Sequence, residues 1–352
     1  MRRSWRRPSR RDPRRWPRWD PRPAALVPNA SDLYTRPFDG GGERGRVSTL
    51  RSIGRRSGAV SKVDAQRSRG PRTWALRFAR GLVSDELRAR MHRVPVDLGE
   101  LGVDPFGLDP QVVQYAAAPL EWLYRHYFRV LANGLDNVPS GRVLLIANHS
   151  GQLPFDGAMI GASMILEHDP PRIVRSMVEK WVPRLPYVSV FFARVGQIVG
   201  TPDNCRRLLE REEAILVFPE GARGISKTFD KRYKLERFGT GFMRLALESR
   251  TPVVPIAVVG AEEQAPSFFN LEPLASLVGM PAFPVTPTFP LLGPAGLLPL
   301  PTRYRIYFGA PMTFEGDGDE EDEVVLVHVA KVKEAIEALI ARGLAERTGI
   351  FT

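Results

Sequence analysis

Five short apolar runs alternate with helical segments between residues 142 and 309, and this alternation constrains the fold more than any other feature of the sequence. It is typical of an α/β domain, in which helices flank a single, mainly parallel β-sheet. The predicted strands are RVLLIAN (142–148), RIVRSMV (172–178), AILVFPE (214–220), PVVPIAVVG (252–260) and RYRIYFG (303–309).

Helices are predicted to begin near Asp156, Thr201 and Phe238. Thr201 is followed by Pro202, which combines an N-cap hydroxyl with a proline at the first helical position. A last helix is predicted from about residue 321 to 347, because apolar residues recur there at helical spacing. Those residues are Val325, Val329, Val332, Ile336, Leu339 and Ile340.

Two segments precede this α/β domain, for which we predict the bounds 120–348. Residues 76–119 are predicted to form a helical lead-in, and a helical pattern continues from Pro110 to about Tyr127 with Pro119 as a break or kink. Residues 1–75 are rich in Arg and Pro and have no regular apolar period, which predicts a disordered basic tail.

The positive charge of the chain belongs to its beginning. Residues 1–80 hold 22 of the 50 Lys and Arg residues and 6 of the 39 Asp and Glu residues; the remaining 28 basic and 33 acidic residues leave residues 81–352 at −5. A basic tail can bind the phosphates of anionic lipid or of nucleic acid by charge alone. No stacking motif accompanies it, so we expect no nucleic-acid partner.

One cysteine and five scattered histidines limit the remaining chemistry. A single cysteine, Cys205, forms no internal disulfide, so a reducing cytoplasm is the expected location. No pair of histidines has metal-ligand spacing, and we expect neither a metal nor a resident cofactor.

A stretch without any charged residue runs from Leu274 to Thr302. Seven prolines between residues 281 and 301 exclude a continuous helix there. Such a loop either covers part of the core, lies against a membrane surface, or lines a channel for an acyl chain.

The segment NHSGQLPFDG (148–157) follows the first predicted strand and carries His149 and Asp156. Ligands of α/β sheets bind at the carboxyl ends of the strands, where His149 is expected. Asp156 has two interpretations: it caps the following helix by accepting from the amide of Met159, or it accepts the Nδ1 proton of His149. The second arrangement leaves Nε2 free to act as a general base.

Two further motifs offer anion-binding groups. VFPEGARG (217–224) ends another strand with Glu220, Gly221 and Arg223 in a tight turn, where backbone amides and a guanidinium can hold a phosphate or a carboxylate. RVGQIVGTPDN (194–204) leads through Gly196 into a helix, whose first amides also favour an anion.

Together these residues resemble the glycerolipid acyltransferases typified by bacterial 1-acyl-glycerol-3-phosphate acyltransferase. The resemblance covers about residues 120–345. Four blocks of that family occur in order: NH…D at 148–156, GQI at 196–198, FPEGARG at 218–224 and VPI at 254–256.

The resemblance implies a glycerol-phosphate-acyltransferase-like fold and an O-acyltransferase whose general base is His149, oriented by Asp156. The acceptor is a glycerolipid hydroxyl and the donor is acyl-CoA or acyl-carrier protein, used as a co-substrate. The resemblance further implies peripheral association with the cytoplasmic face of the membrane. The substrate-binding residues that it implies are Pro219, Glu220, Gly221, Arg223 and Gly196.

Two departures from the family pattern widen the range of acceptors. Six residues separate His149 from Asp156, where four are usual, and Pro202 stands where the second block commonly has an Arg that binds glycerol phosphate. Both changes occur in divergent members of the broader family, including some that resemble diacylglycerol acyltransferases, so a neutral-lipid acceptor is an alternative. An acyl-thioester hydrolase and a non-catalytic lipid-binding protein are the alternatives of another class.

Overall fold

The computed structural model describes residues 81–150, 153–178, 187–270 and 284–352. They contain a seven-stranded sheet in the order β1-β9-β6-β2-β5-β3-β4 and a two-stranded ribbon, β7-β8. The predicted tail lies outside these ranges, as do the first residues of the predicted lead-in. The strands are β1 (Leu131–Asn133), β2 (Val143–Ala147), β3 (Val174–Val178), β4 (Ile198–Val199), β5 (Ala214–Val217), β6 (Val253–Val259), β7 (Phe269–Asn270), β8 (Pro284–Val285) and β9 (Arg305–Phe308).

The carboxyl ends of five strands lie at one edge of the sheet. β2 is parallel to β5 and β6, and β3 is parallel to β5 and β4, whereas β9 is antiparallel to β6. Ile146 lies opposite Val217, so the residues after β2 and β5 leave the sheet at the same level. The predicted mainly parallel sheet is confirmed, and the short edge strands β1 and β4 are additions that no apolar run indicated.

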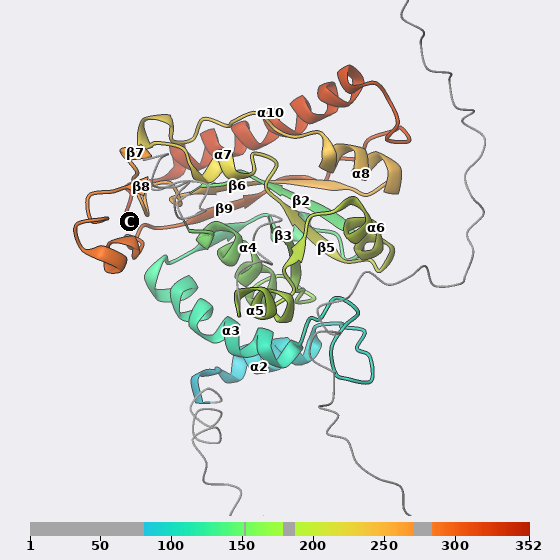
Figure 1. The fold of residues 1–352 in the computed structure, drawn as a ribbon, viewed down its shortest axis with the longest axis horizontal. Coiled ribbons are helices and arrows are strands. Elements are labelled where there is room, and N and C mark those ends of the chain that lie inside the picture. Colours follow the sequence, from blue (N-terminus) through green and yellow to red (C-terminus); the bar gives the residue numbers. More distant parts are fainter. Residues whose placement is uncertain (1–80, 151–152, 179–186, 271–283) are drawn as a thin grey trace, which may run out of the picture. The chain divides into compact units, whose positions relative to one another are not determined.

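Helices cover both faces of this sheet (Figure 1). Val143, Leu145 and Ala147 of β2 join the core that contains α2, α3 and α4, whereas Leu144 and Ile146 join the core that contains α6, α8 and α10. Alternate residues of a strand point to opposite faces, so β2 is apolar throughout. The helices are α2 (Asp85–Arg93), α3 (Pro110–Trp122), α4 (Phe155–Leu166), α5 (Val188–Arg194), α6 (Pro202–Glu210), α7 (Ala222–Ile225), α8 (Gly241–Ser249) and α10 (Asp322–Glu346).

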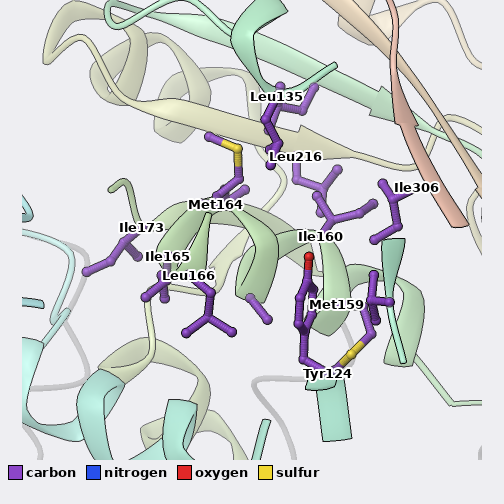
Figure 2. Close-up of a cluster of buried hydrophobic side chains, with 14 of the residues drawn as sticks. Tyr124, Leu135, Met159, Ile160, Met164, Ile165, Leu166, Ile173, Leu216 and Ile306 are labelled. Carbon is purple, nitrogen blue, oxygen red and sulfur yellow. The ribbon is translucent and has the colours of Figure 1, made fainter. Parts of the chain in front are cut away.

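Helix α4 lies at the centre of the first core. Figure 2 shows its side chains, among them Met159 and Ile160, packed with Leu216 of β5 and Ile306 of β9. Met159 and Ile160 are fully buried, and burial of a side chain of this size contributes about 1.5–3 kcal/mol. The first turn of α4, which carries Asp156, is therefore fixed relative to the sheet.

Helix starts and breaks agree in part with the sequence. Thr201 caps α6 by accepting from the amide of Asn204 at 3.3 Å, as predicted. Helix α8 begins at Gly241 rather than near Phe238. At Pro119, where a break or kink was predicted, the helix is not broken: α3 passes through this residue and continues as the π-helical turn η3 (Leu123–Tyr127). A proline removes one donor without ending a helix that is packed on a core. Across the described ranges, no helix has the length and hydropathy needed to cross a bilayer.

Candidate active site

Asn148 fastens the end of β2 to β6. Its side-chain amide donates to the carbonyl of Val258 at 3.1 Å, and its carbonyl oxygen accepts from the amide of Val258 at 2.8 Å. Both bonds are fully buried, which makes them costly to lose. They fix the point at which the chain leaves the sheet, so the next residue, His149, starts from a rigid support.

His149 and Asp156 meet directly. The distance from Nδ1 of His149 to Oδ2 of Asp156 is 2.7 Å, with the imidazole 13% exposed and the carboxylate 0% exposed. Nε2 makes no hydrogen bond to any described residue. A buried carboxylate on Nδ1 stabilises the tautomer that carries its proton there, and Nε2 of the partly exposed ring is then the acceptor.

Asp156 is held by the backbone as well. Its Oδ2 also accepts from the amide of Ser150 at 2.8 Å, and its Oδ1 accepts from the amide of Gly157 at 2.7 Å. The N-cap of α4 is Pro154, and no side chain caps the helix. The interpretation of Asp156 as the N-cap is therefore wrong: the residue lies inside the first turn and points back at the loop.

The FPEGARG turn lies against the same histidine. The ring of Phe218 stacks on the imidazole with centroids 4.1 Å apart and planes at 22°. Glu220 is buried, and its Oε1 accepts from the backbone amide of His149 at 3.0 Å. The exits of β2 and β5 thus form one site, as two neighbouring strand ends should.

Glycines allow this close approach. A Cβ at Gly224 would lie 2.8 Å from Cβ of His149 and 3.1 Å from Cβ of Glu220, so no larger residue fits without a shift. Gly221, with φ of +58°, turns the chain into α7. Arg223 is exposed, and its Nη2 donates to the carbonyl of Arg237 at 2.9 Å.

The other two blocks have different surroundings. Gly196 has φ of +85°, and a Cβ there would lie 2.8 Å from Cδ1 of Leu108 and 3.6 Å from Nη1 of Arg175. It precedes β4, on the side of the sheet where β3 begins. Pro255 is buried within β6, opposite Ile146 of β2, and belongs to the sheet itself.

One side chain near the site, that of Lys227, was not identified by any feature of the sequence. Lys227 is buried between the carboxylates of Glu220 and Glu262, at 3.4 and 3.1 Å. Burial raises the pKa of Glu262 to about 7, with the Lys227 charge acting in the opposite direction. A single Lys in a loop has no periodicity, and only the fold brings these residues together. In the described part of the chain, no three His, Cys, Asp or Glu residues are grouped as metal ligands.

Comparison with known proteins gives the family to which this chain belongs. A model of the family described as Acyltransferase matches residues 129–259. An uncharacterized protein of Mycobacterium leprae (strain TN) is 41% identical over 259 residues, which cover 72% of this chain and 71% of that protein.

Two more distant relatives have names that describe an activity. The "DGAT1/2-independent enzyme synthesizing storage lipids" of Gallus gallus is 22% identical over 212 residues, covering 60% of this chain and 58% of its own. A "Probable 1-acyl-sn-glycerol-3-phosphate acyltransferase" of Mycoplasma pneumoniae (strain ATCC 29342 / M129 / Subtype 1) is 27% identical over 148 residues, covering 40% and 53%. This chain belongs to the Acyltransferase family, whose model matches the part of its α/β domain that carries His149 and the FPEGARG turn.

Proposed function

We propose that this protein transfers a fatty acyl group from acyl-CoA or acyl-carrier protein to a hydroxyl of a glycerolipid such as lysophosphatidate, with His149 as the general base. The observation that carries the proposal is the 2.7 Å contact between Nδ1 of His149 and the buried carboxylate of Asp156. A base held by an orienting carboxylate, with its other nitrogen free, is the arrangement that general-base catalysis needs.

The proposed reaction is a direct transfer. The acceptor hydroxyl gives its proton to Nε2 of His149 while its oxygen attacks the thioester carbonyl carbon. The tetrahedral intermediate collapses as the carbon–sulfur bond breaks, and the leaving thiolate takes the proton from the imidazolium. The products are an ester and a free thiol. General-base catalysis contributes about 10²- to 10⁴-fold in rate, and positioning of the two substrates must supply the rest.

Arg223 is the residue that we propose meets an acceptor phosphate, with Pro219 and Gly221 holding the acceptor from the same turn. Its guanidinium donates to the backbone carbonyl of Arg237, and both arginines are exposed. Neither arginine forms an ion pair with another described residue, so both charges are available to an anion. The name of the Mycoplasma pneumoniae relative agrees with an acceptor of this class.

A neutral lipid is the second candidate acceptor. Pro202 stands where the second block of the family pattern commonly has an Arg, and the name of the Gallus gallus relative describes storage-lipid synthesis. The two acceptors differ in their dependence on charge. Arg223→Met should raise the KM for lysophosphatidate at least about tenfold, the loss of one charged hydrogen bond, and leave the KM for diacylglycerol within about twofold.

One assay separates transfer from its rivals. The full chain is incubated with a mixed pool of acyl-CoA and with lysophosphatidate, other lysophospholipids or diacylglycerol, and products are identified by mass spectrometry. We expect a new ester only when an acceptor is present. Rapid release of fatty acid without acceptor would instead indicate a hydrolase, and no product with any acceptor, from acyl-CoA or from an acyl-carrier protein donor, would indicate a non-catalytic lipid-binding protein.

We also propose that the protein works at a membrane surface, on its cytoplasmic face. The chain between β6 and β9 leaves the sheet at the edge that carries His149, and Ser267 in it accepts from the amide of Phe229 at 2.8 Å. Apolar side chains are exposed on this excursion and cations on the segment beside it, a combination suited to an anionic bilayer. The apolar residues are Phe268, Phe269, Leu291, Leu292 and Leu298, and the cations are Lys231, Arg232 and Lys234.

Flotation with vesicles tests this surface. The full chain should float with vesicles of phosphatidylglycerol and phosphatidylcholine, and Leu291→Glu combined with Leu292→Glu should reduce the bound fraction severalfold. Leu101→Glu is the control, because Leu101 is also exposed but lies in the loop whose Asp104 contacts the beginning of β3. Equal binding of the double variant and the control would refute the proposal that this surface contacts the membrane.

A further inference from the structure

A buried ion cluster lies directly behind the FPEGARG turn. Nζ of Lys227 is 3.4 Å from Oε2 of Glu220 and 3.1 Å from Oε1 of Glu262, and it donates to the carbonyl of Lys234 at 3.2 Å. The side chains of Lys227, Glu220 and Glu262 are 3%, 0% and 7% exposed. Three ionisable groups removed from water in this way must compensate one another.

Glu220 connects this cluster to the loop that carries His149. One oxygen of this carboxylate accepts from the amide of His149 at 3.0 Å, and the other accepts from the amide of Glu236 at 2.8 Å and faces Lys227. Each carboxylate oxygen is therefore already engaged inside the protein. This favours a role in holding the loop over the contact with the acceptor that the sequence suggested.

Small movements of Glu220 are transmitted to the imidazole. Gly224, the last residue of the FPEGARG turn, packs against both His149 and Glu220. A Cβ at this position would lie 2.8 Å from Cβ of His149 and 3.1 Å from Cβ of Glu220. The imidazole is further confined by Phe218 on one face and by Asp156 at Nδ1. A loop held this closely has the precision that a general base requires, because displacements of about 1 Å cost about 10²-fold in rate.

We propose that Lys227 is a positioning residue for the reaction: its charge holds the carboxylate of Glu220 in place, and Glu220 holds the backbone of His149. The two carboxylates that flank Lys227 explain why a cation is needed. Without it, the carboxylates of Glu220 and Glu262 face each other in a buried space with no compensating cation, and they repel each other. Displacement of Glu220 weakens its hydrogen bond to the amide of His149.

The kinetic test uses Lys227→Met, which keeps most of the side-chain volume. We expect kcat to fall about 10- to 100-fold, equivalent to the loss of one charged hydrogen bond, while the KM values for donor and acceptor stay within about threefold. Lys331→Met, at an exposed position on α10, is the matched control and should keep the kcat of the wild type. A Lys227→Met protein with wild-type kcat, or with a change confined to KM, would overturn the proposal.

A double variant separates positioning from simple stabilisation. Glu262→Gln removes the second carboxylate, so Glu220 no longer faces a like charge when Lys227 is lost. Lys227→Met combined with Glu262→Gln should therefore recover kcat to within about threefold of Glu262→Gln alone, and it should fold even if Lys227→Met does not. A folded double variant as slow as Lys227→Met would contradict the charge-compensation argument.

A spectroscopic readout keeps this inference independent of the proposed function, on which only its kinetic part rests. The chain has five histidines, so selective ¹⁵N-histidine labelling gives five backbone amide signals. The His149 signal is assigned by its disappearance in His149→Asn. Its proton shift, moved downfield by the bond to Glu220, should move upfield in Lys227→Met and return in the double variant. An unchanged shift would refute the positioning role even if no acyl transfer were ever detected.

Discussion

Two buried acid–base contacts of similar length lie in different parts of the sheet. His149 and Asp156 meet at 2.7 Å beyond the carboxyl end of β2, and Arg175 and Asp104 meet at 2.6 Å near the beginning of β3. The arginine pair is 1% and 2% exposed, whereas the imidazole is 13% exposed. An arginine stays protonated at any working pH, while a histidine exchanges its proton near neutrality. Burial and charge alone therefore do not identify a catalytic site. A general base also needs an accessible side chain that can exchange a proton near neutral pH.

The arginine pair should dominate stability. Asp104→Ala leaves the Arg175 charge buried without its partner, and we expect a loss of about 3–5 kcal/mol in the free energy of unfolding, measured in urea. Asp97→Ala is the matched control, because its exposed pair with Arg211 should contribute about 0–1 kcal/mol. Equal losses in the two variants would remove the distinction between the buried contact and a surface ion pair.

The histidine pair should dominate catalysis. Asp156→Asn removes the negative charge that stabilises the imidazolium, and we expect kcat to fall about 100-fold, within the usual range for general-base catalysis. The exposed Asp136→Asn serves as the control. Thermal unfolding of both variants must accompany the kinetics, since Asp156 also binds two backbone amides. A kcat above one third of the wild-type value would argue against an orienting role.

The free energy of unfolding should also depend on pH through Glu262, which lies close to the candidate site. Its pKa is raised to about 7 in the folded protein by burial, so between about pH 4.5 and 7 the folded state holds a proton that the unfolded state has lost. Stability from this group is therefore complete below pH 4.5 and falls as pH rises to 7. Glu262→Gln removes this loss, and its stability relative to the wild type should be about 1–3 kcal/mol greater at pH 8 than at pH 5. The exposed Glu334→Gln should show no such difference, and a flat result for Glu262→Gln would contradict the raised pKa.

Gly196 belongs to a sequence block that predicted substrate binding, but in the structure it lies next to Arg175 of the buried arginine pair. Gly196→Ala meets a positive φ and the side chain of Leu108, and we expect a loss of about 1–2 kcal/mol in stability. The acceptor KM of the folded variant then tests the predicted binding role directly. A rise of more than threefold would support it, and an unchanged KM would restrict Gly196 to packing.

The sequence predicted the layout of the fold because that layout depends on long apolar runs. The strands containing Leu145, Leu216 and Val258 needed only hydrophobicity and length to be recognised. β4 and β7 have two residues each and depend on neighbours across the sheet. Helix α8 begins later than predicted because Phe238 is buried before the helical turns start, so its apolar character did not mark the first turn.

The site was predictable to the extent that its residues are adjacent in sequence. The loop at 148–157 offered the contact between His149 and Asp156 as one of two interpretations, and the family resemblance favoured it. Both motifs were placed at strand ends, but only the structure makes β2 and β5 neighbours. The bonds of Asn148 to Val258, and of Lys227 to Glu262, join residues 110 and 35 positions apart. No local pattern specifies such contacts, since they arise only when the parallel strands bring these loops to one edge.

The most direct test of the central claim is the rate of ester formation by His149→Ala. The exposed His92→Ala on α2 is the control, and both proteins should unfold at temperatures close to that of the wild type. With the acyl donor and the best acceptor at saturation, we predict a loss of about 10²- to 10⁴-fold in kcat for His149→Ala and none for His92→Ala. A folded His149→Ala protein that forms ester at the wild-type rate would contradict the assignment of His149 as the base.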